Sequence, residues 1–396
     1  MQRRNEAGNS TVVLRLESMT YGGDALGRAD GKAIFVQGGI AGEQVRAAII
    51  EERGRFARAR VVEVLEPSPD RIEPRCAHFG FTATACGGCQ WQHIAYAAQL
   101  RFKAEIVREQ LRRIGRIDAA PVRETIPGPA WSYRNHAQFS VAPEGRLGFQ
   151  AARSKRVVAI DECHVVETPI AEWLKSARRR HTDRVEVRVA NGEYEGVGVW
   201  ESNLQSPTST FQIKDAAFRV SAESFFQVNT ALLETLVDQV SSKLDVHSGE
   251  TVVDAYCGVG LFTHFIAPLA GQAIGIESSP SAIADARANL AQFENVELRE
   301  GLVEDEFLGI GDSIDAVVLD PPRAGCGPKV IAALSERPVK RLVYVSCDPA
   351  TLARDARQLL DGGYDLIEVQ PVDMFPQTYH IEAIALFLRQ DVKREA

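Results

Sequence analysis

The chain has 396 residues, of which 45% are hydrophobic and 25% charged, which is enough for two or three domains with separate cores. It contains no apolar stretch long enough to cross a bilayer, and its polar first residues, Met1–Glu6, lack the apolar centre of a secretory signal. We therefore expect a cytoplasmic protein with no membrane association. Seven cysteines, an odd number, argue against a disulfide framework in such a compartment.

The net charge of −8 is divided unevenly along the chain. Residues 245–396 carry 12 basic and 24 acidic side chains, whereas residues 1–244 carry 33 basic and 29 acidic ones. Residues 99–116 alone hold six Lys or Arg and two acids. A polyanion would therefore meet the N-terminal half first. Solvated helix faces explain any single basic cluster equally well, so charge alone does not establish nucleic-acid binding.

Residues 10–66 alternate apolar and polar side chains in short pieces separated by glycines. This pattern predicts a small antiparallel barrel of about five strands, in a first domain over 8–66. A second domain is predicted over 70–240. It begins with a cysteine-bearing loop, continues as an amphipathic helix over 96–114 and becomes strand-rich over 130–220.

From residue 241 to residue 396, strand-like runs alternate with helical segments, which predicts an α/β domain with a Rossmann-like, doubly wound parallel sheet. Four of these runs end in, or just before, a chemically active side chain; these are Asp254, Glu277, Asp320 and Cys347. Because open α/β sheets bind ligands at the carboxyl ends of their strands, we expect these four residues to share one site.

The segment Asp254–Gly260 follows a strand and opens a helix, with glycines at 258 and 260. Gly258 lets the backbone approach a ligand, and Glu277, about twenty residues on, can bind both hydroxyls of a ribose. The dinucleotide pattern Gly-x-Gly-x-x-Gly is absent; Asp-x-x-x-Gly-x-Gly followed by Glu is typical of class I S-adenosylmethionine-dependent methyltransferases. Tyr256 offers a ring face to methionine or adenine, and Asp320 can accept from amino groups. A tight glycine turn that binds no nucleotide is the alternative.

The type of methylated atom follows from the residues after two of the strands. Asp320-Pro-Pro-Arg323 resembles the Asp-Pro-Pro-Tyr of amino-methyltransferases, but arginine replaces the stacking aromatic ring. Methylation of a pyrimidine at C5 needs a thiolate that adds to C6 and later leaves, and Cys347 fits that role. A base must then take the C5 proton, and Glu382 is the best candidate. The alternatives are a cysteine that only packs and a solvated acid.

Together, the segments 346–355, 320–325 and 380–382 resemble the RNA uracil-5-methyltransferase family. The resemblance implies that Cys347 is the nucleophile, that Glu382 is the proton acceptor, and that Tyr256, Glu277 and Asp320 contact the cofactor. It alone adds Gln227, within Phe225–Asn229, as a further cofactor contact. It also implies that the N-terminal barrel is an OB-like TRAM domain.

Four cysteines of the first half form a candidate metal site: Cys76, Cys86, Cys89 and the distant Cys163. Four thiolates suit both zinc and a [4Fe–4S] cluster, and their spacing does not separate the two. The resemblance implies the cluster, because TRAM-containing members carry Cys-x5-Cys-x2-Cys and a distant fourth cysteine. Here the first gap is four residues longer, a difference that a loop can absorb.

The sequence therefore predicts an S-adenosylmethionine-dependent enzyme that methylates C5 of a uridine in large-subunit (23S) rRNA. Its expected partner is RNA, with no obligate protein partner, so we expect a monomer. The same chemistry on a tRNA loop uridine is the first alternative, and a non-catalytic RNA-binding or redox-sensing protein is the second. DNA cytosine methylation is disfavoured because the Pro-Cys nucleophile of that family is absent, and Glu294-Asn-Val lies ahead of the nucleophile strand.

Overall fold

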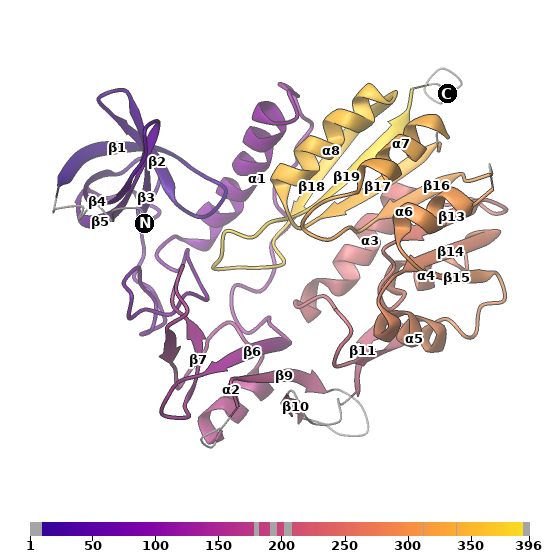
Figure 1. Ribbon diagram of the computed structural model, residues 1–396, viewed down its shortest axis with the longest axis horizontal. Coiled ribbons are helices and arrows are strands. Elements are labelled where there is room, and N and C mark those ends of the chain that lie inside the picture. The colour runs from indigo at the N-terminus through magenta and orange to yellow at the C-terminus, as the bar shows by residue number, and fades with distance from the viewer. Residues whose placement is uncertain are drawn as a thin grey trace, which may run out of the picture.

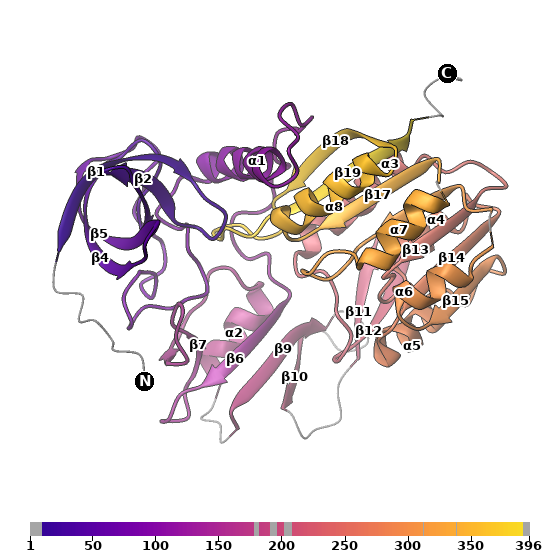
Figure 2. The ribbon, with the colours of Figure 1, turned by 45° about the horizontal axis from the view of Figure 1, so that its top comes forward.

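The computed structural model describes residues 10–177, 182–190, 196–201, 208–311, 313–337 and 339–390 (Figure 1). Three parts are visible: an N-terminal barrel, a central strand-rich part, and a C-terminal sheet covered by helices. Helix α1 (Tyr96–Arg113) lies between the barrel and the C-terminal part in both ribbon views (Figure 2). Within the described residues, no helix is both long and apolar enough to span a membrane.

The predicted N-terminal barrel of five strands is confirmed, but it is not wholly antiparallel as expected, because the strands Lys32–Gln37 and Phe56–Glu66 pair in parallel. Alternating burial along its strands sends Leu14, Leu16, Ile34 and Val36 inward, as the period of two in the sequence requires. The barrel closes in the order β1-β2-β3-β5-β4, with bounds β1 (Thr11–Met19), β2 (Ala25–Ala29), β3 (Lys32–Gln37), β4 (Gln44–Glu52) and β5 (Phe56–Glu66).

Helix α1 confirms the helix predicted over 96–114. Its apolar side packs against α8 and β18 of the C-terminal part, and arginines at its last turn complement the negative end of the helix dipole. The buried side also carries Lys103, whose Nζ lies 2.6 Å from Oδ1 of Asp373, with both side chains fully buried. This ion pair fixes α1 to the segment that leads into the last strand.

Among its described residues, the central part contains a five-stranded sheet, a two-stranded ribbon and one helix. The helix, α2 (Thr168–Ser176), was not expected in a region that the sequence marks as strand-rich. The sheet order is β10-β9-β6-β7-β8, and the strands are β6 (His136–Val141), β7 (Leu147–Gln150), β8 (Val157–Ala159), β9 (Arg184–Ala190) and β10 (Gly196–Glu201). The separate ribbon pairs β11 (Thr208–Ile213) with β12 (Ala216–Ser221).

The C-terminal part is a seven-stranded sheet in the order β15-β14-β13-β16-β17-β19-β18. Its strands are β13 (Thr251–Ala255), β14 (Gln272–Glu277), β15 (Val296–Glu300), β16 (Ala316–Leu319), β17 (Arg341–Ser346), β18 (Tyr364–Val372) and β19 (Glu382–Arg389). The first five are parallel and β19 is antiparallel to both of its neighbours. The predicted doubly wound sheet is therefore confirmed.

Helices cover both faces of this sheet, which explains why β16 and β17 are apolar on both sides. One face is covered by α3 (Leu233–Leu244), α4 (Leu261–Ile266) and α5 (Pro280–Asn289), after the short 3-10 turn η1 (Thr230–Leu232). The other is covered by α1 together with α6 (Val303–Glu306), η2 (Phe307–Gly309), α7 (Pro328–Glu336) and α8 (Pro349–Asp361).

Candidate active site

The sheet register brings the predicted nucleophile and base to the same edge. In the antiparallel pair β17–β19, Ser346 lies opposite Ala383, so the next position along each strand places Cys347 across from Glu382. Glu382 is buried, with 3% of its surface exposed, whereas Cys347 is partly accessible. Asp320 follows the neighbouring strand β16, which is parallel to β17. Cys347, Glu382 and Asp320 therefore lie at the same edge of the sheet.

The predicted cofactor turn has the geometry of a ligand cradle. Tyr256 and Gly258 have left-handed backbones, with φ of 66° and 56°, which fold the chain sharply between β13 and α4. Glu277 braces the turn, because its carboxylate accepts from the backbone N–H of Gly258 at 3.0 Å and of Ser279 at 2.7 Å. A Cβ added to Gly258 would meet no atom within 4 Å, so open space lies above this backbone. A ligand can therefore approach Gly258 closely.

Two carboxyl groups lie near this turn: Asp254 is buried and Asp320 is half-buried. Asp254 accepts from the backbone N–H and the hydroxyl of Thr263 through Oδ2, while its buried Oδ1 makes no hydrogen bond. Burial raises the pKa of Asp254 to about 7. Burial, together with the charge of Asp254, also raises the pKa of Asp320 to about 7. Because a nearby positive charge would favour the ionised form of both groups, the site suits a cationic ligand.

The charged groups around Cys347 shift the pKa of its thiol in opposite directions. Burial raises the pKa of the Cys347 thiol to about 11, and the carboxylate of Glu382 adds to the rise. Burial also raises the pKa of Glu382 well above its usual range, and Asp320 contributes in the same direction. The Arg323 guanidinium lowers the pKa of both Cys347 and Glu382. Arg323 is thus the cation that favours the thiolate and the carboxylate forms that C5 chemistry needs.

Two further residues at this edge were not selected from the sequence. His380 lies 3.4 Å from the guanidinium of Arg323, and burial followed by the charge of Arg323 lowers the pKa of its ring to about 4. Tyr21, in the turn between β1 and β2 of the barrel, donates a 2.7 Å hydrogen bond to Asp348 directly after the nucleophile. Arg323 itself stands in the Asp-Pro-Pro-Arg motif of the sequence. No local pattern points to Tyr21, because it lies 327 positions from its partner Asp348.

Asp348 also explains how the nucleophile is held. Its Oδ1 accepts from the backbone N–H groups of Ala350 and Thr351 at 2.9 and 3.0 Å, so it is the N-cap of α8. The capped helix start and the end of β17 fix the backbone on either side of Cys347.

Gln227 is buried in the segment between β12 and η1, where its backbone carbonyl accepts from the Asn135 side chain at 3.0 Å. Within the part of the chain that the structure describes, its side chain makes no hydrogen bond with the predicted cofactor residues. Its role as a cofactor contact stays a prediction.

The four predicted metal ligands come together. Cys76, Cys86, Cys89 and Cys163 line one cavity of about 270 Å³. Burial raises the pKa of each thiol, to about 11 for Cys86 and about 12 for Cys89. Among the described residues, no three His, Cys, Asp or Glu side chains are close enough to hold a single metal ion.

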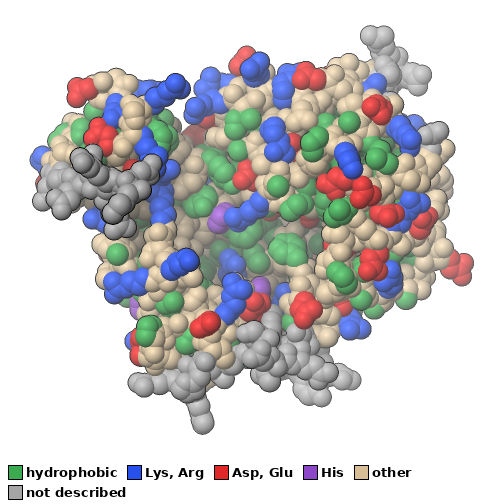
Figure 3. Space-filling model, viewed as in Figure 1, with side chains coloured by type: hydrophobic (Ala, Val, Ile, Leu, Met, Phe, Trp, Pro, Cys, Tyr) green, Lys and Arg blue, Asp and Glu red, His purple; other side chains and the backbone are tan. Residues whose placement is uncertain are grey.

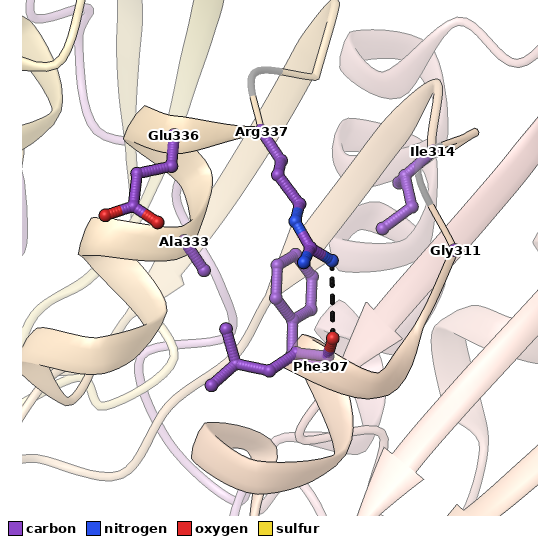
Figure 4. Close-up of a pocket in the computed structure, with 7 residues that line it drawn as sticks. Phe307, Gly311, Ile314, Ala333, Glu336 and Arg337 are labelled. Carbon is purple, nitrogen blue, oxygen red and sulfur yellow. Dashed lines mark hydrogen bonds between the residues drawn. The ribbon is translucent and has the colours of Figure 1, made fainter.

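The molecule is hollowed between the barrel, the central part and the C-terminal part, and Lys, Arg and His side chains gather at this hollow (Figure 3). A separate cavity of about 280 Å³ lies between η2 and α7 (Figure 4). There Arg337 donates to the carbonyls of Leu308 and Ile310 at 3.3 and 3.2 Å. None of the predicted site residues lines that second cavity, so we do not assign it to the chemistry.

Two family models match the chain. Residues 9–62 match the TRAM domain, which is the barrel, and residues 311–390 match the tRNA (uracil-5-)-methyltransferase model, which includes β16 to β19. An uncharacterised RNA methyltransferase of Halalkalibacterium halodurans is 35% identical over 96% of this chain and 97% of its own length. The 23S rRNA (uracil(1939)-C(5))-methyltransferase RlmD of Edwardsiella ictaluri is 32% identical over 97% of both chains.

A solved structure supports the same architecture. The Pyrococcus abyssi tRNA (uracil-54, C5)-methyltransferase, in complex with S-adenosyl-L-homocysteine, aligns with a TM-score of 0.69 over 96% of this chain and 100% of that one. At 24% identity this likeness shows the fold. Relatives that are more than 30% identical over nearly the whole chain show the family as well. The chain belongs to the RNA uracil-C5 methyltransferase family.

Proposed function

We propose that this protein methylates C5 of a uridine in large-subunit rRNA. The observation that carries the proposal is the placement of Cys347 opposite Glu382 at the edge of the sheet that holds the cofactor turn. Relatives that span almost the whole chain and are named for 23S rRNA support the choice of RNA. The solved tRNA enzyme keeps a tRNA loop uridine as the second candidate.

The residues of the turn fit S-adenosylmethionine, which supplies an electrophilic methyl group when bound. Open space above Gly258 admits the ligand, and Glu277 stands where ribose hydroxyls would need an acceptor. Asp254 and Asp320, whose pKa values are raised by burial, offer negative charge for the ammonium and sulfonium groups. Gln227 and the ring of Tyr256 complete the proposed cofactor contacts.

In the proposed reaction, the sulfur of Cys347 bonds to C6 of the uracil, and the electron pair of the C5–C6 double bond moves toward C5. After C5 has gained its methyl group, Glu382 takes the C5 proton. The electron pair of that C–H bond restores the double bond, and the thiolate of Cys347 leaves. Arg323 favours both anions that these steps require, because it lowers the pKa of Cys347 and of Glu382.

We propose that the four cysteines, which line one cavity, hold a [4Fe–4S] cluster, with zinc as the alternative. Four thiolates around one zinc ion would stand about 3.8 Å apart, given zinc–sulfur bonds of about 2.3 Å. In a [4Fe–4S] cube each thiolate binds a different iron, so its four sulfurs stand farther apart than around a single zinc ion. Backbone N–H groups of Gly88, Val165 and Val166 favour the thiolate forms of Cys86 and Cys163, as groups that ligate a cluster require.

RNA that contains 5-fluorouridine tests the proposed mechanism. Fluorine at C5 cannot leave as a proton, so the wild-type protein should stop as a covalent complex that survives denaturation. Cys347→Ala should form no such complex but should still bind the cofactor. Methyl transfer from labelled S-adenosylmethionine to unmodified total RNA then identifies the substrate. Absence of both labelling and adduct in a protein that binds the cofactor would overturn the proposal in favour of a non-catalytic RNA-binding protein.

A further inference from the structure

A cavity of about 450 Å³ lies where the cysteine-bearing loop meets the barrel, and none of the proposed catalytic or cluster residues lines it. We call it the His93 cavity. Its volume falls in the range of about 300–1,000 Å³ that is typical of small-ligand sites. Its lining residues are Gly38, Val61, Arg71, Ile72, Glu73, Pro74, Phe79, Phe81 and His93.

The lengthened gap between Cys76 and Cys86 builds one wall of the His93 cavity, because this gap contains both Phe79 and Phe81. Phe81 packs against the barrel. Its carbonyl accepts a hydrogen bond from Arg60 at 3.2 Å, and its ring lies so close to Gly38 that a Cβ added there would be 2.9 Å from it. The extra residues therefore pack against the barrel. They place two aromatic rings against the barrel.

His93 lies among these rings with 3% of its surface exposed. Its ring centroid is 5.7 Å from that of Phe79 and 5.3 Å from that of Phe81. Neither ring nitrogen makes a hydrogen bond of normal geometry, although the backbone of Gly39 is near enough to influence the ring. Burial, and then the charge of Arg71, lowers the pKa of His93 to about 3. The neutral ring thus offers one donor and one acceptor, and a buried polar group without partners is costly.

Two charged residues line the His93 cavity: Glu73, which is exposed to solvent, and Arg71, which is paired. The guanidinium of Arg71 binds the fully buried carboxylate of Glu43 through Nε at 2.6 Å and Nη2 at 2.7 Å. A phosphate or carboxylate would have to compete with Glu43 for that cation. An uncharged planar ligand would instead lie between aromatic and aliphatic side chains, against the ring of His93.

We propose that the His93 cavity binds one unpaired nucleobase of the RNA substrate, beside the phenylalanine rings and with its polar edge toward His93. Single-stranded RNA is commonly recognised in this way, by aromatic contact with a splayed base and hydrogen bonds to its edge. The proposal rests on the proposed RNA methylation and adds a second, non-reacting base to the recognised substrate. It makes Phe79, Phe81 and His93 specificity-determining residues.

A scan with abasic nucleotides tests the base site. Single abasic residues replace each nucleotide around the target uridine in a large-subunit rRNA fragment that the wild-type protein methylates. We expect one non-target position where loss of the base weakens binding about tenfold. His93→Leu and Phe81→Ala should bind the intact fragment about tenfold more weakly, and the abasic change at that position should then have no further effect.

Thr84→Ala is the matched control, because Thr84 is exposed in the same loop but does not line the His93 cavity. It should respond to every abasic change as the wild type does, and all variants should keep their rate at saturating RNA. If Phe81→Ala fails to fold, His93→Leu carries the test alone, because leucine retains an apolar side chain there. Equal abasic effects in wild type and His93→Leu would overturn the base site, with methylation intact. If the abasic effect is present in the wild type and absent in His93→Leu, but no methyl group is transferred to the RNA, the proposed function would be overturned instead.

Discussion

Glu382 combines two properties that conflict in the resting protein. It must be ionised to accept the C5 proton, yet burial and the neighbouring Asp320 raise its pKa well above the usual range. The resting site therefore favours its neutral form. Arg323 acts against this tendency, and a cationic cofactor near Asp320 would act in the same direction as Arg323. A positive charge near Glu382 therefore favours the ionised form that can act as a base.

Replacement of Glu382 by glutamine should separate addition from elimination. Because the protein already favours a neutral side chain at this buried position, Glu382→Gln should fold and bind RNA normally. Cys347 can still add to C6, but no base removes the C5 proton. We expect turnover to fall at least about a hundredfold and a methylated covalent complex to accumulate with ordinary RNA. Denaturing electrophoresis with labelled S-adenosylmethionine measures that complex.

The double variant Cys347→Ala with Glu382→Gln is the control and should form no complex. Release of free methylated RNA by Glu382→Gln at the wild-type rate would assign the base role to another group.

At the scale of elements, the turn between β1 and β2 of the barrel is tied to the start of α8. Tyr21 donates to Oδ2 of Asp348, and Oδ1 of the same carboxylate caps α8. The ring of Tyr21 also packs edge-on against Tyr379, with centroids 6.0 Å apart. The barrel is therefore joined through one carboxylate to the backbone that carries Cys347.

Tyr21→Phe should weaken this connection without changing any group that touches the uracil or the cofactor. Loss of a hydrogen bond to a charged acceptor costs about 1.5–3 kcal/mol. We expect a lower unfolding temperature and slower adduct formation with 5-fluorouridine RNA, with unchanged cofactor affinity. Tyr379→Phe is the matched control, because the Tyr379 hydroxyl makes no hydrogen bond to the described residues. Indistinguishable behaviour of the two variants would mean that the Tyr21 hydroxyl has no positioning role.

Patterns along the chain were sufficient to predict the elements whose burial is periodic. Alternation and glycine turns predicted the barrel, and apolar runs ending in Asp320 or Cys347 predicted the sheet edge. The helix α2 escaped prediction because it is only nine residues long and lies among strands. The Tyr21–Asp348 contact and the His93 cavity could not be predicted, because each depends on how separately folded segments meet. Such contacts leave no periodic signal in the sequence.

At the scale of the whole molecule, the four cysteines connect segments that are distant in the chain. Cys76, Cys86 and Cys89 belong to the loop beside the barrel, whereas Cys163 lies in the central part next to α2. A cluster bound by all four would close a long loop, and such closure stabilises a fold mainly by restricting the unfolded chain. The buried thiols, with raised pKa values, should otherwise remain protonated and contribute only packing.

The proposed cluster can therefore be tested by composition and by stability. Protein purified without oxygen should contain about four irons and four sulfides per chain. Cys163→Ser should lose them and unfold at a lower temperature, whereas Cys257→Ser, a buried cysteine of the C-terminal part, should keep its iron. Because the sheet edge with Cys347 lies outside this loop, Cys163→Ser should still bind S-adenosylmethionine with wild-type affinity. One tightly bound zinc per chain, in place of iron and sulfide, would contradict the cluster.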